Sequence, residues 1–182
     1  FRKDGKFMVT RIAEKVFVGK NIIHVGVWKR GDERTTYDLI YVDGGTGKAY
    51  AKRFNVTSIT RDKEYDLTKG DKESKVLYFA AHPNGESERV ELQLTPGSSA
   101  RNKVFDFYFE ELAIKGRNAG GNIVTRYPVR KVTQMEVGKS TLGAQKYWYD
   151  DVSGRINKDE RGIYMGSFDT GDQLLTVYSS GE

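Results

Sequence analysis

The chain of 182 residues is long enough for one domain with a buried core, and because it starts at Phe1 without a Met we expect an excised piece of a longer protein. It has no cysteine, which excludes a disulfide framework, a Cys-ligated zinc site and thiol chemistry. The net charge of +5 permits a polyanionic partner without requiring one. No apolar run reaches about 18 residues and no charged-then-apolar leader is present, so we expect neither a membrane span nor a signal peptide.

Short segments rich in aromatic and β-branched residues, separated by turn residues, fill most of the chain. Val90, Leu92 and Leu94 alternate with polar residues, and a period of two is typical of a strand with one buried face. No segment repeats apolar residues at helical spacing over three turns, so the chain is predicted to be all-β. The predicted strands are Phe7–Ile12, Asn21–Trp28, Thr35–Val42, Ala49–Phe54, Lys75–Ala81, Val90–Leu94, Val104–Phe109, Ile123–Tyr127, Val129–Met135, Gln145–Tyr149, Gly162–Phe168 and Gln173–Tyr178.

An internal repeat runs through this pattern. The segment Gly5–Ile12 is echoed by Gly47–Phe54 at a spacing of 42 residues, again by Gly120–Tyr127, and more weakly by Arg161–Phe168. Repeats of this length made of short strands indicate propeller blades, and at roughly 45 residues per blade the chain would hold about four. A β-sandwich with coincidental similarity is the alternative.

Each clear copy of the repeat ends in a basic residue followed by an apolar one: Arg11-Ile12, Arg53-Phe54 and Arg126-Tyr127. Alternation along a strand places such neighbours on opposite faces, so we expect the apolar residue to pack inward and the Arg to project outward. A ring of blades would then carry a band of positive charge that suits a phosphate backbone, whereas the simpler interpretation is a solvated strand face.

The segment Ile114–Asn122 combines basic residues with three glycines, which lets backbone amides and basic side chains approach a phosphate together. A hairpin loop with incidental charge is the alternative.

Gly138-Lys139-Ser140-Thr141 resembles the end of a P-loop, but the leading Gly is missing and no helix is predicted to follow it. The two histidines, His24 and His82, are not spaced as a ligand pair, so the sequence predicts no metal site, no cofactor and no catalytic constellation.

Two stretches of the chain carry a family resemblance. Tyr41–Thr68 and Lys115–Val132 resemble the C-terminal domain of the A subunit of bacterial type IIA topoisomerases, DNA gyrase and topoisomerase IV, and are most similar to the topoisomerase IV-type A subunits of Bacteroidetes. The resemblance is strongest between residues 5 and 132. It implies a β-pinwheel, a propeller-like ring that bends DNA. Residues 1–182 would form a single DNA-binding domain of about four blades, an excised part of a five- or six-bladed domain in a longer subunit.

For function, the resemblance implies a non-catalytic domain that presents a DNA segment to the catalytic core of the topoisomerase. Its partners would be double-stranded DNA, that core and the ATPase B subunit, in a bacterial cytoplasmic, chromosome-associated setting, with ATP and Mg used elsewhere in the parent enzyme. The catalytic Tyr of the parent lies in another domain, and Tyr127, followed by Pro128, is not its counterpart. Gyrase members carry a loop of the form Gln-(Arg/Lys)-Arg-Gly-Gly-(Arg/Lys)-Gly; Ile114–Gly121 departs from that order, which favours DNA bending over gyrase-like wrapping.

The sequence therefore predicts phosphate contacts along the DNA backbone with little base readout. The main contacts are expected from Arg53, Lys115, Arg117, Arg126, Arg130 and Lys131, with secondary contacts from Lys52 and Arg61. The competing hypothesis is a β-propeller that binds protein partners without nucleic acid, which the aromatic content of 12% would also fit.

Overall fold

The computed structural model describes residues 1–169 and 171–180, and within them the chain is all-β, as predicted. The only helix in this part is a single 3₁₀ turn at Phe109–Glu111. No helix in the described residues is long and apolar enough to cross a membrane. In chain order the strands are β1 (Lys6–Met8), β2 (Thr36–Val42), β3 (Ala49–Asn55), β4 (Glu64–Asp66), β5 (Lys75–His82), β6 (Glu86–Leu94), β7 (Val104–Tyr108), β8 (Ile114–Gly116), β9 (Asn122–Thr125), β10 (Val129–Ser140), β11 (Gln145–Asp150), β12 (Arg155–Asn157) and β13 (Ile163–Phe168).

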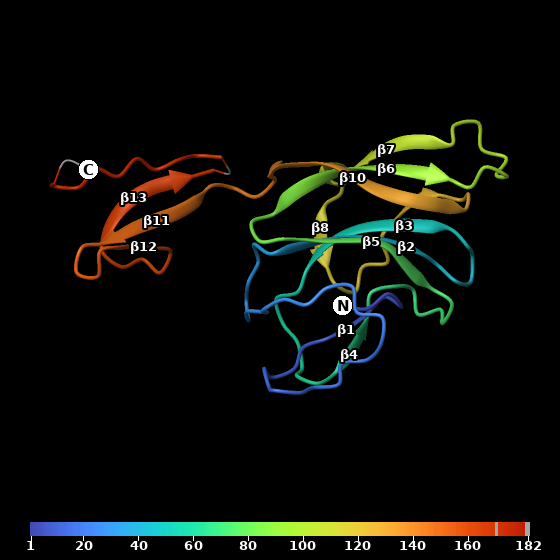
Figure 1. Ribbon diagram of the computed structural model, residues 1–182, viewed down its shortest axis with the longest axis horizontal. Coiled ribbons are helices and arrows are strands. Elements are labelled where there is room, and N and C mark those ends of the chain that lie inside the picture. Colours follow the sequence, from blue (N-terminus) through green and yellow to red (C-terminus); the bar gives the residue numbers. More distant parts are fainter. Residues whose placement is uncertain (170, 181–182) are drawn as a thin grey trace.

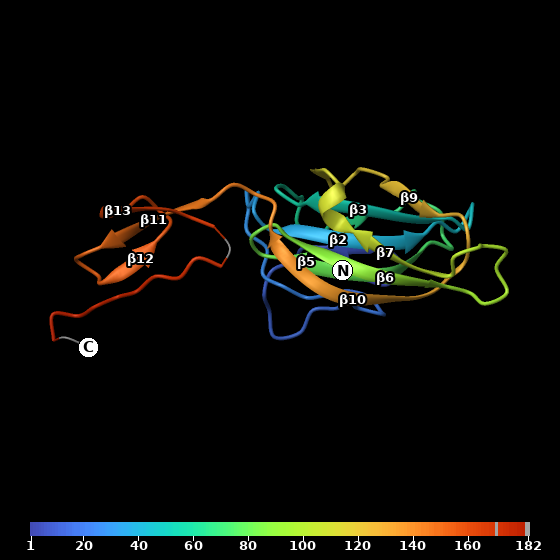
Figure 2. The same ribbon diagram turned by 90° about the horizontal axis from the view of Figure 1, so that it is seen from above.

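The strands fall into a large body, β1 to β10, and a separate C-terminal sheet. Both views show β11, β12 and β13 standing apart from the body and joined to it by the chain that leaves β10 (Figures 1 and 2). This C-terminal sheet has the order β12-β11-β13 and is antiparallel throughout.

The body is built around a five-stranded sheet with β2 and β3 at its centre. The order is β5-β2-β3-β8, and β9 also pairs with β3. A second sheet, β10-β6-β7, lies on one face, and the β1–β4 pair lies on the other. Leu39 and Tyr41 pack into the core beside β1, while Ile40 packs into the core beside β6, so β2 alternates between two buried faces.

Alternating apolar residues produce these cores where the sequence predicts them. Val90, Leu92 and Leu94 of β6 are buried while Glu91 and Gln93 between them are half-buried. Burying these side chains stabilises each layer by about 1.5–3 kcal/mol per residue. The sandwich of layers leaves β2 and β3 with no solvated face over most of their length.

Two predicted strands are wrong and three observed strands were not predicted. Residues 21–28 and 173–178 form no strand in the described part, although Ile22 makes an isolated bridge to Arg2. The unpredicted strands are β4, β8 and β12. Each has three residues, which are too few to show an alternation of apolar and polar positions. The P-loop-like Gly138-Lys139-Ser140-Thr141 lies at the end of β10 with no helix after it, as expected.

The internal repeat has a structural counterpart. Each copy contains a strand, β1, β3, β9 or β13, and each strand follows closely on a glycine with positive φ: Gly5 (81°), Gly47 (68°), Gly121 (84°) and Gly162 (89°). However, β3 and β9 pair with each other in one sheet, so the copies do not mark one blade each. The described sheets are open, and the ring of about four blades stays a prediction.

Candidate nucleic-acid interface

The glycine-rich loop lies over one edge of the central sheet. Strand β8 runs parallel to β3, with Phe54 opposite Lys115, and β9 returns antiparallel along the same edge, with Ala51 opposite Asn122. The loop between them, residues 117–121, must therefore cross back over the edge of β3. Long-range pairing, rather than a local hairpin between β8 and β9, positions this loop.

Two side chains beneath the loop make three hydrogen bonds to its carbonyl oxygens. The Lys52 Nζ donates to the carbonyl oxygens of Arg117 at 2.8 Å and Ala119 at 2.9 Å, and the Tyr41 hydroxyl donates to that of Gly120 at 2.6 Å. A Cβ at Gly121 would lie 2.6 Å from a backbone carbonyl oxygen of β3, so this close approach requires glycine. The loop is thus fixed from below by donors and by close backbone contact.

Lys52 therefore has a structural position that differs from its expected role. Its side chain is buried, and its Nζ lies 4.9 Å from the Phe54 ring centroid. Burial lowers the pKa of Lys52 to about 8, although the charge of Asp66 partly opposes the shift. The ammonium group is directed to the loop carbonyls and not to solvent, so the expectation of a direct phosphate contact from Lys52 is not supported by its placement.

Arg53 also points inward, contrary to the expectation that it projects from the surface. Only 1% of the residue is exposed, and its guanidinium donates to the carbonyl oxygens of Gly85 and Glu86, both at 2.7 Å. Its Nη1 donates to the Thr141 hydroxyl at 2.8 Å, and its Nε lies 3.3 Å from a carboxylate oxygen of Asp38. The physical reason is that β3 is covered on both faces, so alternation sends Arg53 toward β6 and not toward water.

Arg117 is half-buried and is held against the body by two contacts. Its guanidinium carbon lies 4.4 Å from the centroid of the Tyr65 ring, and its Nη1 donates to the carbonyl of Ser58. The Nζ of Lys63 lies 5.5 Å from the centroid of the same ring. A cation over an aromatic face is stabilised by about 0.5–1 kcal/mol at exposed sites. Arg117 therefore orders the loop as well as adding charge to it.

The other five predicted contacts are exposed. Their side chains make no hydrogen bond or ion pair within the described part of the chain, so their charge is available to an external anion. They are Arg61 in the turn before β4, Lys115 on β8, Arg126 directly after β9, and Arg130 and Lys131 at the start of β10. The structure thus brings Lys115 and Arg126 to the edge of the central sheet, while Arg130 and Lys131 lie on the neighbouring β10-β6-β7 sheet.

The recurring arginines do not form the uniform outer band that the repeat predicts. Arg11 and Arg126 are exposed, whereas Arg53 is buried. The expected inward packing of the apolar neighbour also fails in the first copy, where Ile12 is 94% exposed.

Sequence reasoning missed the aromatic and basic residues that surround the loop. The ring of Tyr65 contacts the Arg117 guanidinium. The Nζ of Lys69 lies 3.9 Å from the Tyr50 ring centroid, and the aliphatic part of its side chain lies close to Gly120. The one signal for Tyr65 is its basic neighbour Lys63 two residues earlier, a spacing that places both side chains on one side of a strand. Nothing local signals Lys69, because its proximity to the loop depends on long-range pairing.

The comparison with known families identifies the family of this chain. The family model for the topoisomerase C-terminal domain of Bacteroidota matches residues 1–136. This span includes the body up to the middle of β10, and with it the loop and all eight predicted contacts. No curated protein and no solved structure is significantly similar to the chain.

Proposed function

Because the chain belongs to the topoisomerase C-terminal domain family of Bacteroidota, we propose that it is a non-catalytic domain of a type IIA topoisomerase A subunit that binds and bends DNA. It would present a bound segment to the catalytic core during ATP-dependent changes of DNA topology. The partners proposed for it are double-stranded DNA, the core of the same subunit and the ATPase B subunit, with ATP and Mg bound outside this chain.

The observation that supports DNA binding is the set of five unpaired basic residues on β8 and β10, directly after β9 and in the turn before β4. Exposed Lys and Arg side chains that have no acidic partner can neutralise phosphates and release condensed counterions. Lys115, Arg130 and Lys131 lie on strands, Arg126 directly follows β9, and Arg61 lies in the turn before β4. Placement on or next to strands suits contact with a backbone of fixed spacing. Such contacts position DNA without reading bases, so recognition would depend on charge and on the deformability of the duplex.

For the architecture, we propose that the sheets belong to a β-pinwheel whose further blades lie outside this chain. The four strands that follow positive-φ glycines support a repeated unit. The departure of Ile114–Gly121 from the gyrase loop order supports a role closer to topoisomerase IV, in which DNA is bent without strong chiral wrapping.

The experiment is fluorescence anisotropy of a labelled duplex of about 40 base pairs. A duplex of this length offers the basic residues several phosphates to contact at once. We expect the 182-residue chain to bind at low salt and to lose affinity steeply as salt rises. The variant Lys115→Ala/Arg126→Ala should bind more weakly, because it removes two exposed charges without disturbing a buried contact. The matched control is Arg155→Ala/Arg161→Ala, which removes two exposed charges from the C-terminal sheet.

Absence of duplex binding even at low salt would contradict the proposal. The second candidate, a platform for protein partners, would then be preferred. It is favoured by the exposed apolar side chains of the N-terminal segment, where Phe17, Val25 and Val27 are about 80% exposed.

A further inference from the structure

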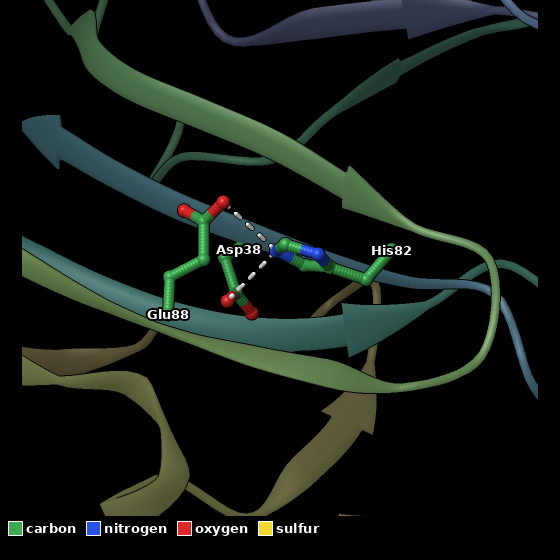
Figure 3. A group of neighbouring side chains, drawn as sticks. All are labelled: Asp38, His82 and Glu88. Carbon is green, nitrogen blue, oxygen red and sulfur yellow. Dashed lines mark ion pairs between the residues drawn. The ribbon is translucent and has the colours of Figure 1, made fainter. Parts of the chain in front are cut away.

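A buried cluster of three side chains of metal-binding types lies between the central sheet and the β10-β6-β7 sheet, away from the glycine-rich loop. Asp38 comes from β2, His82 from the end of β5 and Glu88 from β6. All three residues are at most 5% exposed, and one potential ligand atom from each lies within 4.8 Å of the others. Figure 3 shows the His82 ring placed between the two carboxyl groups.

The distances within the cluster are longer than those of hydrogen bonds. The His82 Nε2 lies 3.4 Å from an oxygen of Asp38 and 3.4 Å from an oxygen of Glu88, whereas N–H···O bonds in proteins measure about 2.7–3.2 Å. Neither the His82 Nε2 nor either carboxylate oxygen of Asp38 has a hydrogen-bond partner in the described part of the chain. Buried polar atoms without hydrogen-bond partners are costly even where charged groups lie near them, so their convergence here requires an explanation.

Each of the two distances from His82 to a carboxylate matches an edge of a tetrahedral coordination shell. Zn²⁺ binds nitrogen and carboxylate oxygen at about 2.0–2.2 Å, which places neighbouring ligands of a tetrahedron about 3.4 Å apart. One imidazole and two carboxylates form a mixed N/O donor set of the kind that first-row divalent ions accept. Thr36 lies opposite His82 in the strand register, and its buried hydroxyl oxygen also lacks a partner.

The residues around the cluster hold the two carboxylates in place, as the neighbours of metal-binding side chains do. Arg53 Nε lies 3.3 Å from the Asp38 oxygen that does not face His82. Tyr78 and Gln134 each donate a hydrogen bond to the carboxylate of Glu88. Hydrogen bonds of this kind orient the metal-binding side chains and are a regular feature of metal sites.

From this geometry we propose that Asp38, His82 and Glu88 bind one divalent transition-metal ion, with Zn²⁺ as the ion of best fit. The ion would join β2 and β5 of the central sheet to β6 of the covering sheet, and would have a structural role. The sequence expectation of no metal site rested on the spacing of the two histidines alone, and the structure brings two carboxylates to one of them.

The competing occupant of this position is a proton on His82. Burial by itself lowers the pKa of His82, but the carboxylates of Asp38 and Glu88 raise it by more, so the folded protein favours a positive charge between them. A protonated imidazole would place a positive charge between the carboxylates without a metal ion. The experiment must therefore distinguish a bound metal ion from a proton on His82.

The test uses the 182-residue chain stripped of metal with a chelator and titrated with Zn²⁺, and separately with Co²⁺ as a spectroscopic probe. We expect one ion per chain, a rise in the unfolding temperature with added Zn²⁺, and the strong visible absorption of four-coordinate Co²⁺. His82→Gln and Glu88→Gln should each weaken Zn²⁺ affinity by at least about tenfold. His24→Gln, the matched control at the other histidine, should bind as the wild type does.

If His82→Gln does not fold, Glu88→Gln retains the size of the side chain and supplies the same comparison. Failure of the wild-type chain to take up Zn²⁺ or Co²⁺ would overturn the proposal and leave the proton as the occupant. Binding that survives both substitutions, or that His24→Gln weakens equally, would overturn it as well.

Discussion

Replacing Lys52 with Met tests whether a buried ammonium group supports the glycine-rich loop. The pKa of Lys52 is lowered from 10.5 to about 8, mainly because burial disfavours its charged form. Each pKa unit corresponds to about 1.4 kcal/mol, so the folded state disfavours the charged form by about 3 kcal/mol relative to the unfolded chain. Met keeps a long unbranched side chain and cannot titrate.

The sign of the pH dependence follows from this lowered pKa. Between about 8 and 10.5, the unfolded chain holds a proton on Lys52 that the folded chain has lost, so the free energy of unfolding rises with pH. Below this window both states are protonated and the full cost of burying the charge remains. The stability of the wild type minus that of Lys52→Met should therefore increase by about 3 kcal/mol across the window.

Urea denaturation of both proteins at the two ends of the window measures this difference. Every other titratable group is common to both proteins, so its contribution cancels in the comparison. Parallel pH dependences would refute the reasoning, because they would mean that Lys52 has the same pKa in the folded and unfolded states.

Two further substitutions probe the loop and the buried arginine by chemical denaturation. Gly121→Ala should lower the free energy of unfolding by about 1–2 kcal/mol or more, because its φ is +84° and the added Cβ would meet backbone atoms. The control is Gly116→Ala, where the space around the added Cβ is open. Equal effects of the two substitutions would contradict this account. Arg53→Met should cost about 3–5 kcal/mol because it removes a cationic partner of the buried Asp38 carboxylate and the donor to the carbonyl oxygens of Gly85 and Glu86. A loss no greater than that of the exposed Arg126→Met would show that these buried contacts contribute little.

Much of the fold could be predicted from local pattern. Strands β2, β3 and β6 lie where alternation and flanking turns predict them, because each presents enough apolar positions to define a face. Residues 21–28 carry a similar apolar pattern, yet they form no strand. A strand requires a partner edge, which a local pattern does not provide, and β4 and β8 show the converse, since β1 and β3 offer them an edge.

The candidate site was less predictable for a related reason. A period of two shows that Lys52 and Arg53 face opposite sides, but not that other layers cover both sides. The hydrogen bonds that Lys52 makes to the loop span 65 and 67 residues and depend on the pairing of β3 with β8 and β9. One local signal was present: Asp38 lies within an apolar strand, and a buried carboxylate requires a partner such as Arg53.

The dependence of duplex affinity on salt tests the central claim most directly. We expect the logarithm of the association constant to fall linearly with the logarithm of salt concentration, and the slope to become shallower by about 0.9 for each phosphate contact removed. For Lys115→Ala/Arg126→Ala this predicts a change of about 1.8, with no change for Arg155→Ala/Arg161→Ala. A slope that is the same in the wild type and both variants, or that changes only in the control, would contradict the assignment of these exposed basic residues to the DNA backbone.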